Sequence, residues 1–188
     1  WKPNETRGIF RSTDGGVTWK KILYVNDIAG AADLTFDPSN PRILYASTWN
    51  MKRNGYRMDS GGPDSKLWKS TDSGETWTEL SSRPGMPGGM NGIIGVTVSP
   101  VNPNRVWAII ENSQAPGVYR SDDAGQTWRE VAAPAFPPQP EGAEGPAWKL
   151  DHVFALERSG DAIWCGTVPG GLFVSRDRGE TWTLDETL

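Results

Sequence analysis

Four aspartates that recur along the chain are the first residues whose type and spacing suggest chemistry. Each lies in the pattern Ser-x-Asp-x-Gly-x-Thr-Trp, and the serines of successive copies are 58, 51 and 54 residues apart. Such carboxylates could be catalytic acids or calcium ligands, but the pattern lacks the ligand series of a calcium loop. An Asp side chain accepts hydrogen bonds from backbone N–H groups just ahead of it, and Gly permits the positive φ of a tight turn. We therefore interpret the four aspartates as structural.

The residues of the four turns are Ser12, Asp14, Gly16, Thr18 and Trp19; Ser70, Asp72, Gly74, Thr76 and Trp77; Ser121, Asp123, Gly125, Thr127 and Trp128; and Ser175, Asp177, Gly179, Thr181 and Trp182.

A second group of functional residue types lies in the segment 48–66. Trp49, Arg53, Tyr56 and Arg57 combine aromatic rings with cations, a mixture that suits an anionic or sugar ligand. Long loops on a rigid scaffold often carry binding sites. The alternative is a solvated loop that folds over its neighbour. Trp148, in the long segment 132–150, is a further candidate for ligand binding.

Acid–base chemistry has three candidate residues, Asp59, Asp151 and His152. Asp151 and His152 are adjacent, and such a pair could transfer protons. The alternative for a lone histidine is a hydrogen-bonded core residue. Because the chain has one His and one Cys, Cys165, neither an ordinary Cys/His zinc site nor an internal disulfide is expected. We expect no metal and no cofactor.

Charge and hydropathy argue against a nucleic-acid binder and against a membrane-spanning segment in this sequence. The net charge is −4 and the pI about 5.1, without the basic patch that marks nucleic-acid binders. No apolar run approaches the roughly 18 residues that span a bilayer.

Short strands must position all of these residues. An apolar-aromatic pair precedes each serine, and alternating residues follow each tryptophan, so each motif is the turn of a β-hairpin. Two further strands lie upstream in each full repeat, as in Leu34–Phe36 and Ile43–Ala46. Four antiparallel strands per period make one propeller blade. The fold class is therefore all-β: a β-propeller, here an incomplete arc of about three and a half blades.

The expected division of the chain follows the repeat. It places the last hairpin of a blade at 1–26, blades at 27–85 and 86–134, and a long crossover with a blade at 135–188. Since the chain begins at Trp1, within a repeat, we expect it to be a fragment whose end blades contact further blades of a parent propeller or other copies. The Asp-box turns share one edge of each blade, so the site is expected at the opposite edge.

The turn motif is similar to the Asp-box, or BNR, repeat shared by sialidases, sortilin-type receptors, xyloglucanases and photosystem assembly factors. Residues 3–130 resemble bacterial exported sortilin-like proteins, often labelled glycosyl hydrolase, through 3–8, 37–41 and 60–63. Residues 148–188 resemble other bacterial Asp-box proteins through 150–154 and 166–173.

That resemblance implies an extracellular or periplasmic module that binds a protein, a peptide or a glycan. The first alternative is a glycoside hydrolase. The Arg-Ile-Pro signature of sialidases is absent from this sequence, and a xyloglucanase would need two acids across a cleft, for which Asp33, Asp59 and Asp151 are candidates. The second alternative is an assembly scaffold.

Overall fold

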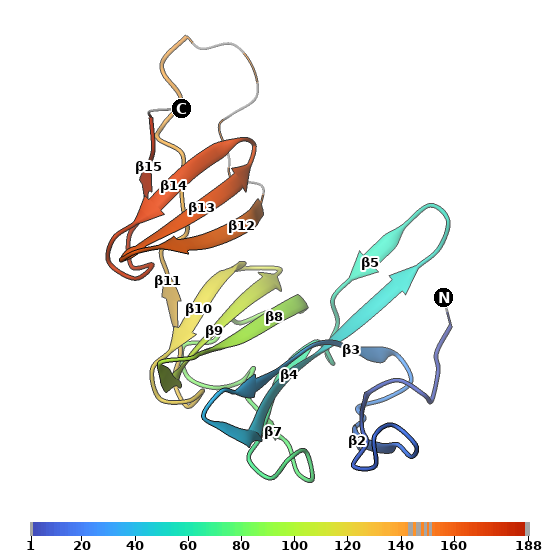
Figure 1. Cartoon of the computed structure of the whole chain (residues 1–188). Coiled ribbons are helices and arrows are strands. Elements are labelled where there is room, and N and C mark those ends of the chain that lie inside the picture. Colours follow the sequence, from blue (N-terminus) through green and yellow to red (C-terminus); the bar gives the residue numbers. More distant parts are fainter. Residues whose placement is uncertain (1, 143–144, 146–147, 149, 151, 187–188) are drawn as a thin grey trace. The chain divides into compact units, whose positions relative to one another are not determined.

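The computed structural model describes residues 2–142, 145, 148, 150 and 152–186, and these residues contain strands and no helix. The chain divides into two compact units, Trp1–Glu130 and Val131–Leu188. One separate hairpin, one five-stranded sheet and two four-stranded sheets, all antiparallel, follow one another along the described part of the chain (Figure 1). This arrangement confirms the all-β class and the incomplete propeller predicted from the Asp boxes.

The first unit begins with a hairpin of β1 (Ile9–Arg11) and β2 (Lys20–Leu23). The next sheet comprises β3 (Ala29–Asp37), β4 (Asn40–Arg53), β6 (Lys66–Ser70) and β7 (Thr78–Glu79), with β5 (Met58–Ser60) paired to β4. The following sheet comprises β8 (Asn91–Ser99), β9 (Asn102–Asn112), β10 (Gly117–Ser121) and β11 (Arg129–Val131). Apart from β5, which pairs with β4 alone, neighbouring strands of each sheet follow one another in sequence, as in an up-and-down blade.

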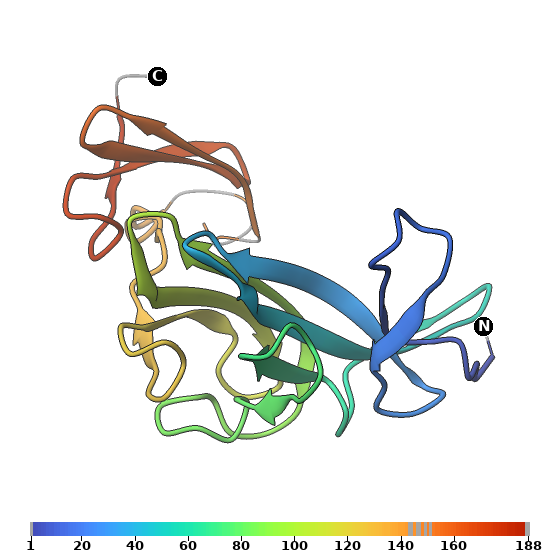
Figure 2. The same ribbon diagram turned by 60° about the horizontal axis from the view of Figure 1, so that its bottom comes forward.

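The core of the first unit lies between successive sheets. Figure 2 shows β3 and β4 beside β8. Residues of both sheets form one buried cluster: Tyr45, Leu67, Leu80, Ile94, Val96, Val98, Val106, Ala108, Ile110, Tyr119 and Trp128. A smaller cluster joins the first hairpin to the next sheet through Ile9, Leu23 and Ala46. Each large apolar side chain buried in this way contributes about 1.5–3 kcal/mol.

The second unit contains β12 (His152–Ser159), β13 (Ala162–Val168), β14 (Gly171–Ser175) and β15 (Thr183–Leu184) in one antiparallel sheet. Cys165 and Phe173 are fully buried in this unit. The ring of Phe136, from the long crossover, meets the Phe173 ring edge-on with centroids 5.2 Å apart. The crossover therefore covers part of the sheet with an aromatic side chain.

All four Asp-box turns have the same hydrogen bonds. In each, one carboxylate oxygen accepts the backbone N–H of the following Thr at 2.8–2.9 Å, and the other accepts the Thr hydroxyl. The Ser hydroxyl donates to the carboxylate and accepts the Gly N–H at 2.7–2.8 Å. The residue three after each Ser has a positive φ, including the non-glycine residues Ser73, Ala124 and Arg178. These bonds hold that uncommon conformation in place.

The same bonds keep the four aspartates ionised. The pKa of each carboxyl is lowered from its ordinary value of 3.8 to about 2. For Asp14, Asp72 and Asp177 the largest cause is the hydroxyl of the following Thr, and its N–H is the second. For Asp123, burial acts in the opposite direction and is outweighed by the hydrogen bonds from Thr127 and Ser121. Hydrogen bonds to the charged form are the physical reason in all four.

The Asp-box turns lie at the same edge as the turns between the first two strands of each sheet. Ser73 N donates to Arg42 O at 2.8 Å, and Ala124 N donates to Asn104 O at 2.7 Å. β4 runs away from this edge, because Leu44 at its beginning pairs with Ser70. Its other end therefore emerges at the opposite edge of the blade.

The segment 48–66 differs from the long loop expected there, because most of it is strand. β4 continues to Arg53 and pairs with β5 in the register Met51↔Ser60, Lys52↔Asp59 and Arg53↔Met58. Asn54 closes the connecting turn: its N–H donates to Arg57 O, and its side chain accepts the N–H groups of Tyr56 and Arg57, each at 2.9 Å. We call this two-stranded projection, residues 51–60, the β4–β5 ribbon; Figure 1 shows it extending beyond its sheet.

Candidate functional site

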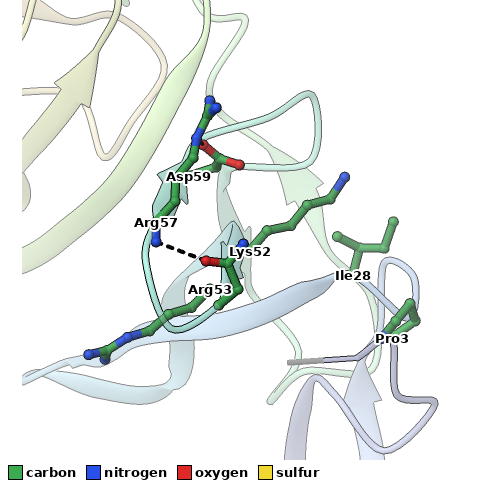
Figure 3. Close-up of a pocket in the computed structure, with 7 residues that line it drawn as sticks. Pro3, Ile28, Lys52, Arg53, Arg57 and Asp59 are labelled. Atoms are coloured by element: carbon green, nitrogen blue, oxygen red, sulfur yellow. Dashed lines mark hydrogen bonds and ion pairs between the residues drawn. The ribbon is translucent and has the colours of Figure 1, made fainter.

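A hollow of about 370 Å³ lies against the β4–β5 ribbon. Its lining residues come from the ribbon and from the chain before β3: Pro3, Ile28, Lys52, Arg53, Asn54, Arg57 and Asp59. Figure 3 shows Pro3 and Ile28 on one side of the hollow, with the Lys52 side chain extending toward them from the ribbon. The hollow thus combines an apolar wall with charged groups, as ligand sites do.

The positive charge of this hollow is only partly neutralised. Arg57 forms an ion pair with Asp59, and both side chains are well exposed. For Lys52 and Arg53 the described part of the chain supplies no ion pair or hydrogen bond to the side chain. Two uncompensated cations therefore lie next to each other in sequence on β4, with their side chains on opposite faces of the ribbon (Figure 3), in a chain whose net charge is negative. A ligand with acceptor oxygens or a negative charge would complement them.

Tyr56 lies at the tip of the ribbon and its side chain is fully exposed. Met58, on the adjoining strand, is also exposed. An exposed ring with a polar hydroxyl provides a flat contact surface with a hydrogen-bonding end. Tyr56, Arg53 and Arg57, three of the sequence-predicted binding residues, therefore share one projecting element.

Trp49 has a different position, because its indole is fixed at the root of the ribbon. Its Nε1 donates to Ser60 Oγ at 2.9 Å, and Ser60 Oγ donates to Glu111 Oε2 at 2.6 Å. Glu111 Oε2 also accepts Ile93 N at 2.9 Å. These bonds connect the ribbon to the next blade. Trp49 therefore helps to position the ribbon, and its role in ligand binding stays a prediction.

The acid–base candidates are not brought together as a pair in the part of the chain that the structure describes. Asp59 is paired with Arg57. Asp33 Oδ2 accepts Val96 N at 2.8 Å, which holds β3 to β8, and its Oδ1 accepts Leu34 N. Asp151 lies outside the described residues. These contacts give both described carboxylates structural partners.

The remaining candidates belong to the second unit. His152 lies on β12 opposite Val168, and Cys165 on β13 lies opposite Leu156, so the two are not a cross-strand pair. Burial raises the pKa of the Cys165 thiol. Trp148 is about half exposed, between residues that the structure does not describe.

The described residues offer neither a metal site nor a membrane-spanning helix. No group of three or more His, Cys, Asp or Glu side chains in these ranges could hold a metal ion. No helix among them is long and apolar enough to cross a membrane.

The cations of the ribbon could be recognised from the sequence, whereas the residues that support the ribbon, Asn54, Ser60 and Glu111, were not among the predicted residues. The pair Asn54-Gly55 is a turn signal that could have revealed the hairpin. The Ser60–Glu111 bond had no such signal, because the two residues are 51 positions apart and lie in different repeats.

Comparison with known proteins agrees with this architecture. A family model described as Sortilin-Vps10, "Sortilin, neurotensin receptor 3", matches residues 65–187, more than half of the chain, and a BNR/Asp-box repeat model matches residues 10–21. The xyloglucanase Xgh74A of Acetivibrio thermocellus is 32% identical over 98% of the chain, which corresponds to 22% of that protein. An oligoxyloglucan-reducing end-specific xyloglucanase of Emericella nidulans is 28% identical over 96% of the chain and 22% of that protein.

A solved structure supports the fold independently. The crystal structure of an ancestral GH74 enzyme superposes with a TM-score of 0.58 at 16% identity, covering 95% of this chain and 23% of that one. The likeness confirms the β-propeller fold. The chain spans about a fifth of the length of these relatives.

Proposed function

Because the chain belongs to the Sortilin-Vps10 family and spans about a fifth of its xyloglucanase relatives, we propose that it is the recognition part of a larger, exported Asp-box propeller. Its ligand is an extended glycan, bound at the β4–β5 ribbon outside the cytoplasm. In this proposal the propeller units are 1–26, 27–85, 86–134 and 135–188.

One observation carries this proposal: the ribbon presents a fully exposed Tyr56 in its turn and, on its β4 strand, two cations, Lys52 and Arg53, that have no partner in the described structure. The tyrosine ring supplies a flat surface for a sugar ring. Lys52, Arg53 and the Asn54 amide supply donors for hydroxyl or carboxylate oxygens. Since both cations are uncompensated, a glycan with carboxylate groups is bound more tightly than a neutral one.

Titration calorimetry with two oligosaccharide series, one neutral xyloglucan-derived and one containing uronic acids, tests this function. We expect Tyr56→Ala to weaken binding roughly tenfold, since aromatic contacts contribute about 0.5–1.5 kcal/mol beyond buried area. Lys52→Ala with Arg53→Ala should weaken binding of the uronate series more than that of the neutral series.

Matched controls lie at the opposite edge of the blade. Phe36→Ala removes an exposed ring, and Arg42→Ala removes an exposed cation, so both should leave affinity unchanged. The proposal fails if neither series binds, or if the controls weaken binding as much as the ribbon variants do. Binding of peptides alone would assign the ribbon to protein recognition instead.

Glycoside hydrolysis is the second candidate, and the similarity to xyloglucanases favours it. Asp59 would supply one acid, once a bound substrate displaces Arg57 from it. Release of reducing ends from xyloglucan by the full-length protein, abolished by Asp59→Asn, would support this candidate. Release that is unchanged in the variant would remove Asp59 from the reaction.

A further inference from the structure

The register of the β4–β5 ribbon brings Lys52 directly opposite Asp59, on one face of the ribbon. Opposite charges in such a cross-strand pair attract each other. Asp59 nevertheless forms its ion pair with Arg57, whose Nε donates to Asp59 Oδ1. Figure 3 shows the Lys52 side chain extending toward Ile28 instead, and no described residue forms an ion pair with it. The acid opposite Lys52 is therefore engaged by a different cation.

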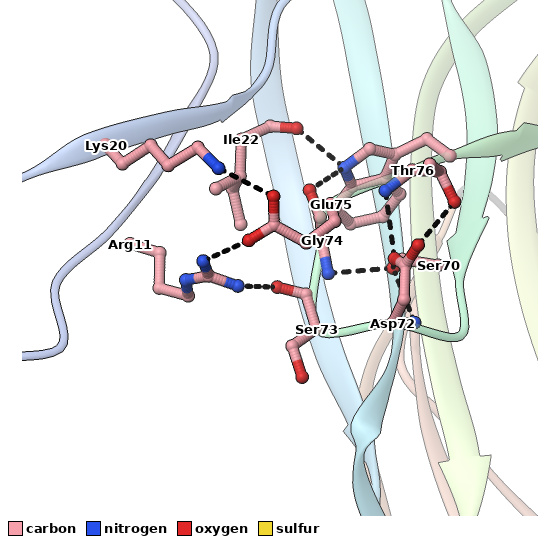
Figure 4. Close-up of polar contacts among 10 residues, drawn as sticks. Arg11, Lys20, Ile22, Ser70, Asp72, Ser73, Gly74, Glu75 and Thr76 are labelled. Atoms are coloured by element: carbon pink, nitrogen blue, oxygen red, sulfur yellow. Dashed lines mark hydrogen bonds and ion pairs between the residues drawn. The ribbon is translucent and has the colours of Figure 1, made fainter.

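Other lysines of the same blade do reach carboxylates across a gap between strands. Lys66 Nζ on β6 contacts Glu79 Oε1 on β7 at 3.0 Å. Lys20 Nζ, from the preceding hairpin, contacts Glu75 Oε2 at 2.6 Å (Figure 4). Lys52 lacks such a contact although an acid lies directly opposite it. The length of a lysine side chain therefore does not explain why Lys52 is unpaired.

The unpaired ammonium group lies at the hollow of about 370 Å³, which Lys52, Arg57 and Asp59 all line. Arg57 and Asp59 neutralise each other there, so the charge of Lys52 is left over on this face of the ribbon. Pro3 and Ile28 supply an apolar wall. A carboxylate that enters this hollow meets a cation with no internal competitor.

We propose that Lys52 binds the carboxylate of an acidic sugar, and that Arg57 is a positioning residue that keeps Lys52 available by holding Asp59. This inference rests on the proposed glycan-binding function and names the residue that selects acidic over neutral glycans. Asp59 competes with the ligand carboxylate for Lys52. Without Arg57, the Asp59 carboxylate turns to the lysine opposite it and neutralises the hollow.

A matched pair of ligands isolates the carboxylate. Galacturonic acid hexasaccharide and its methyl ester have the same sugars and linkages and differ in charge. In titration calorimetry of the intact chain at low ionic strength, we expect the acid to bind roughly threefold more tightly than the ester, the size of an exposed ion pair. Lys52→Ala should abolish this preference, and Lys52→Arg should keep it. Arg42→Ala, an exposed cation at the opposite edge of the blade, is the control and should also keep it.

A double-mutant cycle separates positioning by Arg57 from direct binding. Arg57→Ala should abolish the preference for the acid although Lys52 is still present, because Asp59 then neutralises the lysine. Asp59→Asn should increase the preference, and Arg57→Ala/Asp59→Asn should restore it to at least the wild-type value. If Arg57 itself bound the carboxylate, the double variant would stay as unselective as Arg57→Ala.

A second measurement needs no ligand. Acetic anhydride labels unpaired lysines faster than lysines held by a carboxylate, which favours the charged form. Mass spectrometry of the labelled peptides should show Lys52 reacting roughly twofold more slowly in Arg57→Ala than in the wild type. Arg57→Ala/Asp59→Asn should recover the wild-type rate. Lys66, which is paired with Glu79, is the internal reference and should react equally in all variants.

Two results overturn the positioning role of Arg57: unchanged labelling of Lys52 in Arg57→Ala, or a double variant that does not regain the preference for the acid. Equal binding of acid and ester by the wild type overturns the role of Lys52 and leaves the proposed glycan-binding function standing. If the wild type binds no glycan of either kind, that function and the carboxylate assignment of Lys52 both fail.

Discussion

The two edges of the second blade use polar residues in opposite ways. At the Asp-box edge, Asp72 and Ser70 satisfy one another and the backbone of the turn, and Arg11 and Lys20 are paired with Glu75. At the ribbon edge, Lys52 and Arg53 have no partner within the described residues. The repeated residues of this sequence thus build the scaffold, whereas an unrepeated segment carries charge that the described residues leave unsatisfied.

The largest expected difference concerns tryptophans of the same motif. Trp128→Ala should cost about 3–5 kcal/mol of unfolding free energy, because it removes a buried ring from the main core. Trp19→Ala, at the uncovered first turn, should cost less than about 1 kcal/mol. Urea denaturation followed by circular dichroism measures both. Equal losses of unfolding free energy in the two variants would show that burial between blades does not determine how much the Asp-box tryptophan stabilises the protein.

A buried turn hydroxyl should have the next largest effect. Ser121 is fully buried, and Ser121→Ala leaves the N–H groups of Asp123 and Gly125 without their acceptor. The expected loss is about 1–3 kcal/mol in urea denaturation. Ser82→Ala, at an exposed loop position, is the control and should change stability by less than about 0.5 kcal/mol. A loss no larger than that of the control would contradict a structural role for the hydroxyl.

Acid should weaken the Asp-box edge within a defined range of pH. The four carboxyls have a pKa of about 2 in the folded state, below the ordinary 3.8 that applies after unfolding. Their contribution is therefore complete above the ordinary pKa and is lost as the pH falls from there through the folded value. The urea midpoint should decline over that interval. In Asp72→Asn the midpoint should be lower near neutral pH and the decline shallower; an unchanged slope would contradict this assignment.

The smallest effect on stability is expected at the ribbon edge. Tyr56→Ala and Arg53→Ala should change the unfolding free energy by less than about 0.5 kcal/mol, because both side chains are exposed and without partners. Backbone amides of the ribbon should also exchange with deuterium faster than those of β8 and β9, since fewer strands protect them. A stability loss comparable to that of Ser121→Ala would show that these residues belong to the scaffold.

The scaffold could be predicted from the sequence because its information is local and repeated. The five defined positions of each Asp box lie within eight residues, and four copies confirm one another. The turn, its hydrogen bonds and the strands on each side all follow from residues such as Asp72 and Gly74.

The candidate site could be predicted only as a segment. Its cations and Tyr56 were recognisable by type, but the continuation of β4 to Arg53 depends on pairing with β5. The positions of Trp49 and Ser60 depend on Glu111, in another repeat. Asp33 was a candidate acid because its bond to Val96, also in another repeat, cannot be recognised from its neighbours in sequence. The structural interpretation of Asp33 therefore depends on a contact between two repeats, which the sequence of one repeat does not reveal.

One consequence of the continuous β4 concerns insertions and deletions. Since side chains alternate between the two faces of a strand, adding one residue to each strand of the β4–β5 ribbon reverses which face every later side chain occupies. Lys52 would then exchange faces with Arg53, and Pro3 and Ile28 would lie beside a different charge. Homologous ribbons that keep this hollow can change length only in steps of two residues per strand, whereas the adjoining turn at Asn54 can vary freely in its exposed side chains.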